Sequence, residues 1–217
     1  MAALVLLTTL AACGGKKQSA EEETTGWEYI GDSQATDSTI YGICTDGTTM
    51  NMLQMLTDSG DTLTLSLTTA QEYNRVLGGI AVGDRMAVLA NAQRTEATLV
   101  INQSTLMGEW VMPNPMDGSS EMGIYIKDGG IAESINMGTL VYQSWRLQNG
   151  TLEIVSTRDD GANYEEVSRY KILYLTSDSL SLRDDEGVTE YRRPIPDENY
   201  DDVDVDLDEG SFNDFVM

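Results

Sequence analysis

The fold of this chain is indicated by one stretch, Glu133-Ser134-Ile135-Asn136-Met137-Gly138-Thr139-Leu140-Val141-Tyr142-Gln143-Ser144-Trp145. Residues of this stretch alternate between two sets, each made of every second position. Ser134 and Asn136 belong to the same set, whereas Tyr142 and Trp145 belong to opposite sets. A period of two places the two sets on opposite faces of a β-strand. Because glycine tolerates the backbone angles of a short turn, the stretch predicts two strands joined tightly at Gly138.

Turn signals recur at regular spacing on both sides of this stretch. They are Asp128-Gly129-Gly130, Asn149-Gly150, Asp159-Asp160-Gly161, Ser177-Asp178 and Asp185-Glu186-Gly187. Together with an opening strand over residues 106–112, they divide the region into about eight short strands, a pattern typical of sandwiches and barrels. An eight-stranded meander that closes into a barrel loses its sheet edges and has room for one small ligand.

Several residues of this region carry a resemblance to a known family. Gly108-Glu109-Trp110 resembles the Gly-x-Trp of a lipocalin first strand, and Arg192 or Arg193 stands where a last-strand arginine packs on that tryptophan as a cation–π pair. With residues 132–145 between them, the pattern is similar to the short lipocalin-like domains of Bacteroidetes lipoproteins. The resemblance covers residues 106–193 and implies an up-and-down lipocalin-like β-barrel.

The candidate site residues follow from this barrel. Trp110, Trp145 and Arg192 are expected to plug and staple one end of it. Ser134 and Asn136 are polar and share a predicted strand face. They either point into a cavity, together with Tyr142, or meet solvent, and the sequence leaves both alternatives open.

The region before the barrel, residues 27–104, predicts a second β-rich domain. Strands are expected over residues 39–44, 49–56 and 62–67, a short helix over 68–77, and strands over 85–90 and 97–101. Thr69 and Glu72 have the spacing of a capping box, and Gly78-Gly79 is expected to end the helix. Three strands, a helix and two strands is the order of an OB-fold, so the whole chain is predicted to be all-β.

Composition excludes several function classes. The net charge is −23, so binding to nucleic acid by phosphate neutralisation is not expected. The chain has no histidine, which removes Ser-His-Asp and Cys-His catalysis and every histidine-containing metal site. Cys44 lies in an apolar strand and reads as a buried, inert thiol. We therefore expect no enzyme activity, no cofactor and no metal site.

The N-terminus indicates export and anchoring. Residues 1–12 form an apolar run that is too short to span a bilayer and suits a signal peptide, although no basic residue precedes the run. Its end, Leu10-Ala11-Ala12-Cys13, resembles the bacterial lipobox, which implies an acylated Cys13 that anchors the chain in a membrane. Residues 13–26 read as a polar tether. An outer membrane lipoprotein is predicted, and Glu21-Glu22-Glu23 leaves both the cell surface and the periplasmic face open.

The C-terminal residues 195–217 form an acidic tail. Its nine carboxylates occur without a basic residue, a composition typical of a solvated segment. The alternation in Asp202-Val203-Asp204-Val205-Asp206 leaves calcium binding open, although Gly210 does not stand where an EF-hand requires its glycine.

Two functions remain open for the barrel domain, residues 105–194. One is a small-molecule-binding protein that holds an apolar ligand in the barrel. The other is a non-catalytic structural or protein-interaction module of the cell envelope whose barrel is filled by its own side chains, as small eight-stranded barrels often are. The number of large side chains that point into the barrel discriminates between them.

Overall fold

A computed structural model describes residues 36–118, 120–158 and 164–195. The chain divides into two units, residues 1–36 and 37–217. The described part is nearly all-β, with one six-stranded and one eight-stranded sheet, both within the second unit. The predicted signal peptide, Cys13, the tether and the acidic tail from residue 196 onward lie outside the described residues, and the predicted boundary between residues 104 and 105 falls inside the second unit.

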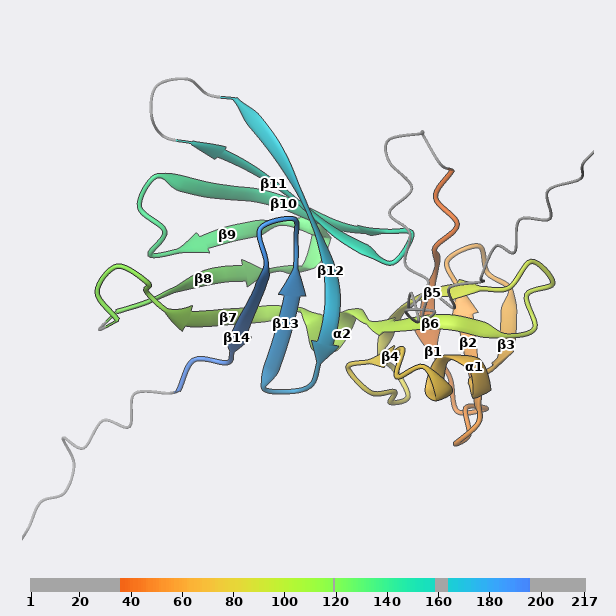
Figure 1. Cartoon of the computed structure of the whole chain (residues 1–217). Coiled ribbons are helices and arrows are strands. Elements are labelled where there is room, and N and C mark those ends of the chain that lie inside the picture. Colours follow the sequence, from red (N-terminus) through yellow and green to blue (C-terminus); the bar gives the residue numbers. More distant parts are fainter. Residues whose placement is uncertain (1–35, 119, 159–163, 196–217) are drawn as a thin grey trace, which may run out of the picture. The chain divides into compact units, whose positions relative to one another are not determined.

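The six-stranded sheet, called the first sheet below, follows the predicted element order closely. Its strands are β1 (Ile40–Cys44), β2 (Met52–Thr57), β3 (Thr62–Ser66), β4 (Val76–Leu77), β5 (Arg85–Ala90) and β6 (Ala97–Asn102), with α1 (Thr68–Glu72) after β3. The order across the sheet is β3-β2-β1-β5-β6-β4 (Figure 1). A parallel bridge between Ser66, at the end of β3, and Glu96, just before β6, brings these two distant strands of the sheet together. This order and its closure agree with the predicted OB-like small barrel.

The helix of the first sheet differs from the prediction. It ends at Glu72 instead of Leu77, and no side chain caps its N-terminus, so the predicted capping box does not form. Asn74 adopts a positive φ of 53°, which ends the helix. The chain then runs as β4, which pairs in parallel with β6 and buries Leu77. Burial of this leucine in the core outweighs the local preference for helix.

The eight-stranded sheet, called the barrel below, is antiparallel throughout. Its strands are β7 (Gly108–Pro113), β8 (Glu121–Ile126), β9 (Ala132–Ile135), β10 (Leu140–Gln148), β11 (Thr151–Arg158), β12 (Glu165–Leu175), β13 (Ser179–Arg183) and β14 (Val188–Arg192). The order is β10-β11-β12-β13-β14-β7-β8-β9 (Figure 1), so the first and last strands of the region, β7 and β14, are neighbours. A short helix that the sequence did not predict, α2 (Gln103–Leu106), precedes β7.

The barrel is nearly closed. The place where its two edge strands, β9 and β10, meet is called the seam below, and it lies within residues 133–145. β9 and β10 are joined at Gly138 as predicted, but they lie at the two ends of the ladder instead of forming a regular hairpin. One bridge, between Ile131 and Ser144, connects the two sides. The Ser134 hydroxyl supplies further contacts, because it donates to the Leu140 carbonyl and accepts from the Tyr142 amide, both at 2.7 Å. A serine side chain here takes the place of backbone pairing.

One hydrophobic core connects the two sheets. Leu77, Ala87, Leu99 and Ile101 of the first sheet belong to the same buried cluster as the side chains inside the barrel. A second cluster, centred on Leu53, Met55 and Leu65, fills the first sheet and includes the free thiol of Cys44, which is buried as predicted.

Candidate functional site: the barrel interior and its closed end

The end of the barrel where β7 begins is closed by a tryptophan and an arginine. Trp110 is fully buried and donates its indole N–H to the Leu106 carbonyl at 2.7 Å. The Arg193 guanidinium carbon lies 3.6 Å from the centre of the Trp110 ring, a cation–π geometry. Gly108, with a φ of 117°, makes this stacking possible, because a Cβ at this position would overlap Nη1 of Arg193. The Gly-x-Trp spacing is thus explained by the space the arginine needs.

Arg193 also binds four backbone carbonyls. Its Nη2 donates to Thr105 O at 2.7 Å and Met107 O at 2.9 Å, Nη1 donates to Glu109 O at 3.2 Å, and Nε donates to Ser177 O at 3.1 Å. Burial lowers the pKa of this guanidinium. The fork of donors connects the turn after β12 to the α2–β7 junction, so the side chain joins two segments that are far apart in the sequence.

Arg192 is not the arginine that packs on Trp110. Strand alternation turns it to the outer face, where it forms an ion pair with Glu121. The two side chains of this pair are 42% and 37% exposed. Arg193, the alternative that the sequence left open, occupies the stapling position because it directly follows β14 on the side opposite to Arg192, which is the side that Tyr191 presents to the interior.

Tyr142 and Trp145 both point into the barrel, although simple alternation places them on opposite faces. The register of β10 against β11 shifts between Tyr142 and Ser144, which marks a β-bulge at Gln143. An extra residue in one strand reverses the facing of everything beyond it. Tyr142 and Trp145 are therefore only 7% and 8% exposed, and Trp145 donates its indole N–H to the Lys127 carbonyl at 2.7 Å.

Ser134 and Asn136 do not form a polar pair. Ser134 lies directly across from Ile124 on the inward face, with its hydroxyl bound to the backbone of β10 at the seam. Asn136 lies beyond the end of β9, has a φ of 51° and is exposed. Its side-chain amide donates to the Glu121 carbonyl at 2.9 Å. The alternation that predicted a shared face stops at Ile135, one residue before Asn136.

The inside of the barrel is filled by large side chains. They come from seven of its eight strands: Trp110, Ile124, Ile126, Ala132, Tyr142, Trp145, Leu147, Leu152, Ile154, Ile172, Leu175, Leu180 and Leu182 are all buried in one cluster. Tyr170 and Tyr191 pack against this cluster from β12 and β14. An eight-stranded barrel is just wide enough for side chains to fill.

Three tyrosines are polar groups of this interior, beside Ser134 and the buried Ser156, which lies directly across from Tyr142. Burial is the main cause that raises the pKa of both Tyr142 and Tyr170. Burial, reinforced by the charge of Tyr170 and of Asp184, raises the pKa of Tyr191 to about 12. All three hydroxyls therefore stay protonated at neutral pH and act as neutral hydrogen-bonding groups.

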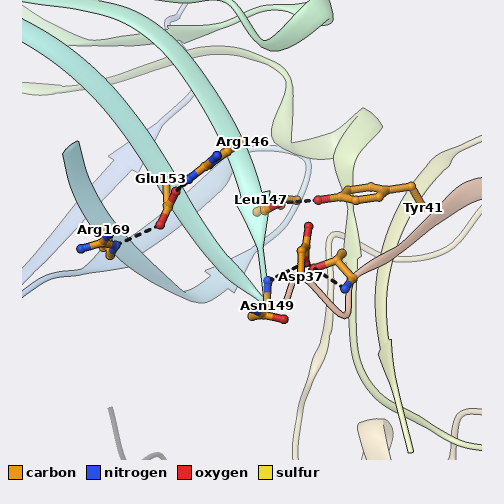
Figure 2. Close-up of polar contacts among 8 residues, drawn as sticks. Asp37, Tyr41, Arg146, Leu147, Asn149, Glu153 and Arg169 are labelled. Carbon is orange, nitrogen blue, oxygen red and sulfur yellow. Dashed lines mark hydrogen bonds and ion pairs between the residues drawn. The ribbon is translucent and has the colours of Figure 1, made fainter. Parts of the chain in front are cut away.

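On the outer face, a glutamate is held between two arginines of neighbouring strands. Glu153 lies directly across from Arg146 on β10 and from Arg169 on β12 (Figure 2). Its side chain is 8% exposed and accepts from Arg146 Nε at 2.6 Å and Arg169 Nε at 2.9 Å. Burial alone would raise the pKa of Glu153, but the hydrogen bonds and charges of Arg169 and Arg146 outweigh it and hold this pKa below its usual value.

Comparison with known proteins agrees with this geometry. Residues 102–194 match the family model described as lipocalin-like. This part of the chain belongs to the lipocalin-like family. A lipocalin-like protein from Bacteroides thetaiotaomicron, known from its crystal structure, is 33% identical over 42% of this chain and 97% of its own, with a TM-score of 0.38. No curated protein matches the chain. The lipocalin-like family is generally a binding fold.

Two further features of the described residues concern metal binding and membrane spanning. Across 36–118, 120–158 and 164–195, no three acidic or cysteine side chains come together in a way that could hold a metal ion. Neither helix in these ranges is long and apolar enough to cross a membrane. The predictions about Cys13, the tether and calcium concern residues outside them.

Proposed function

We propose that this protein is a non-catalytic, lipid-anchored module of the bacterial cell envelope, and that its lipocalin-like barrel is a rigid scaffold filled by its own side chains. The packing of the barrel interior is the observation that carries this proposal. Trp110 of β7 and Leu152 and Ile154 of β11 are each at most 2% exposed. An apolar ligand of ordinary size would need to displace several such side chains, each of which contributes about 1.5–3 kcal/mol by its burial.

A second function, an apolar ligand bound inside the barrel, is supported by family membership. Lipocalin-like barrels can hold one small ligand, and the hydroxyls of Tyr142, Tyr170 and Tyr191 would give such a ligand polar partners. Fold alone is a weak argument for function, whereas the packing is a property of this chain. We therefore favour the filled scaffold.

The two functions can be separated by creating a cavity. Leu152→Ala removes a fully buried side chain, and it is expected to lower the free energy of unfolding by about 2–5 kcal/mol and to leave a dry apolar hole. The protein starting at Gly14 and its Leu152→Ala variant are titrated with benzene, a probe that fills such holes. A filled barrel predicts binding to the variant only.

Native mass spectrometry provides a second measurement on the same samples. The filled scaffold predicts the mass of the polypeptide alone. A reproducible extra mass that passes into organic solvent, together with benzene binding by the unsubstituted protein, would favour the ligand-binding function instead.

The anchor is tested separately. We expect a Cys13→Ala variant, expressed in a bacterial host with its leader, to lose incorporation of labelled palmitate and to leave the membrane fraction. Cys44→Ala is the matched control, because this buried thiol lies inside the first sheet. Protease treatment of intact cells then distinguishes the cell surface from the periplasmic face.

A further inference from the structure

A cleft lies at the edge of the barrel core, where the first sheet meets the barrel. Its volume is about 320 Å³. At ~30 Å³ per water molecule, this space equals roughly ten waters, so it suits a ligand of about ten non-hydrogen atoms. Its lining includes Tyr41 of β1, Arg85 of β5, Gln103 of α2, Met107, Asp128 and Leu147 of β10.

Hydrogen bonds hold the two walls of the cleft together. The Tyr41 hydroxyl donates to the Leu147 carbonyl, and the Asn149 amide donates to Thr39 Oγ1 at 2.9 Å and to the Asp37 carboxylate at 3.3 Å. Figure 2 shows Tyr41 directed at Leu147, with Asp37 beside Asn149. Because these contacts join β1 to the β10–β11 hairpin, the cleft is formed before a ligand arrives, which lowers the cost of binding.

The charges around the cleft are balanced. Arg85 donates to both oxygens of Asp58, at 3.0 and 2.6 Å, and these two side chains are 42% and 51% exposed, so the cleft can be reached from solvent. Asp128 is close enough to Arg85 to act on its charge, and Arg146 is paired with Glu153. With both arginines already paired, the cleft offers little attraction to an anion and favours an uncharged ligand.

Gln103 lines this wall, and its side-chain oxygen is shielded from solvent behind the cleft surface. It is 9% exposed, and its Oε1 is the one buried side-chain oxygen or nitrogen within residues 36–118, 120–158 and 164–195 that has no hydrogen-bond partner. A buried carbonyl oxygen without a partner is destabilising. Rotation of the Gln103 side chain toward the cleft would bring this oxygen to a ligand hydroxyl and give it the partner that it lacks.

We infer that the cleft binds an uncharged, polyhydroxylated ring of about the size of one monosaccharide. Such a ring has hydroxyls that both donate and accept, which matches the amide of Gln103, the carboxylate of Asp128 and the guanidinium of Arg85. It also has an apolar C–H face, which matches the wall formed by Met107 and Leu147. Ligand sites commonly combine apolar walls with a few convergent polar groups in this way, and often lie where two structural units meet.

This site is independent of the proposed scaffold function. Trp145 and Leu147 belong to both the cleft wall and the barrel core. The ligand of the cleft would nevertheless be soluble in water, so it cannot be confused with an apolar molecule extracted from the interior. Benzene binding tests whether the barrel is filled, and sugar binding tests the cleft. Each of the two proposals can therefore be refuted without the other.

The test is a titration of the protein from Gly14 onward with D-glucose, D-galactose and D-mannose, followed by calorimetry and by saturation-transfer NMR. At least one sugar is expected to bind. Gln103→Met keeps the side-chain volume but removes the amide, and Asp128→Asn keeps the shape but removes the charge. Each is expected to raise the Kd about tenfold, as the loss of a hydrogen bond to a charged or buried group does.

Gln143→Met is the matched control, because Gln143 is exposed on the outer face of β10 and bonds only to Thr157 Oγ1 among the contacts described. It should leave the Kd unchanged. Asp128 lies on an exposed turn, so Asp128→Asn remains informative if Gln103→Met fails to fold. No binding of any of the three sugars, or equal binding by both cleft variants, would overturn the inference. If glycine or acetate binds and the sugars do not, the inference that the ligand is uncharged is wrong.

Discussion

Arg193 is expected to contribute more to stability than any other charged side chain described, and the residue beside it provides the control. In Arg193→Ala the ring of Trp110 loses a cation at 3.6 Å, and four carbonyls lose their donor. The perturbation therefore acts on one end of the barrel and on the α2–β7 junction together.

The magnitude follows from these contacts. A hydrogen bond to a charged donor contributes about 1.5–3 kcal/mol, and a desolvated cation–π pair adds about 1–2 kcal/mol. Only the two bonds from Nη2 are shorter than 3 Å, and energies of groups that share one side chain do not add fully. We expect a loss of roughly 3–5 kcal/mol, which for a protein of this size lowers the Tm by about 6–20 °C.

Two further variants make the prediction specific. Arg192→Ala removes an ion pair whose side chains are 42% and 37% exposed, so it should cost no more than about 1 kcal/mol. Arg193→Lys keeps the charge but not the planar fork, so it should recover less than about half of the loss. Gly108→Ala should resemble Arg193→Ala, because its Cβ takes the place of the guanidinium.

The assay is urea unfolding, followed by tryptophan fluorescence and by far-ultraviolet circular dichroism at matched protein concentration. If Arg193→Ala unfolds at the same urea concentration as Arg192→Ala, the arginine does not staple the barrel. If Arg193→Lys is as stable as the unsubstituted protein, the charge matters and the fork geometry does not.

Three further predictions concern the seam, the buried glutamate and the tyrosines. Ser134→Ala should lower the free energy of unfolding by about 1–3 kcal/mol, because two backbone groups at the seam lose their partner; faster hydrogen exchange at the Tyr142 amide should accompany it, and an unchanged rate there would contradict the role of the hydroxyl. Glu153 has a folded pKa below its ordinary 4.5, so its contribution is present above that pH and is lost as the pH falls through the folded pKa. Glu153→Gln should therefore be less stable by about 1–3 kcal/mol at neutral pH, and the difference should shrink in acid; a difference independent of pH would count against the ion pairs. Tyr191 has its pKa raised from 10.0 to about 12, so its contribution is present below pH 10.0 and is lost as the pH rises toward 12. Tyr191→Phe should not show this alkaline loss, and equal pH profiles for the two proteins would show that the hydroxyl is not buried.

The hairpin at Asn149-Gly150 shows how much of the structure is available from local sequence. Both residues adopt positive φ, as a two-residue turn of this type requires. Such a turn fixes the register, so that Gln148 faces Thr151 and Arg146 faces Glu153. The Arg146–Glu153 pair therefore follows from the local sequence once this turn is identified, although only the structure brought it to notice. The contact of Arg169 with Glu153 could not have been predicted, because no tight turn fixes the register of β12 against β11.

The seam of the barrel illustrates the opposite case. Alternation and turn residues predict both strands around Gly138. No local sequence pattern predicts that β9 and β10 separate while β7 and β14 pair. The bulge at Gln143 is also invisible in the pattern, and it decides that Tyr142 and Trp145 face the same interior. A bulge forms where packing on both faces favours an extra residue, and that packing depends on other strands.

By itself the sequence determined the fold class, the approximate strands, the lipocalin-like segment and the burial of Trp110, because turn chemistry and period-two alternation act over a few neighbouring residues. Only the tertiary structure decided which of two adjacent arginines covers Trp110, that the barrel interior is filled, and that a cleft with an unsatisfied Gln103 lies at its wall. Each of these depends on side chains brought together from segments more than forty positions apart in the sequence, such as Trp110 and Arg193 or Gln103 and Trp145. Contacts of that range are set by the closure of the barrel and its packing on the first sheet, and no local pattern encodes them.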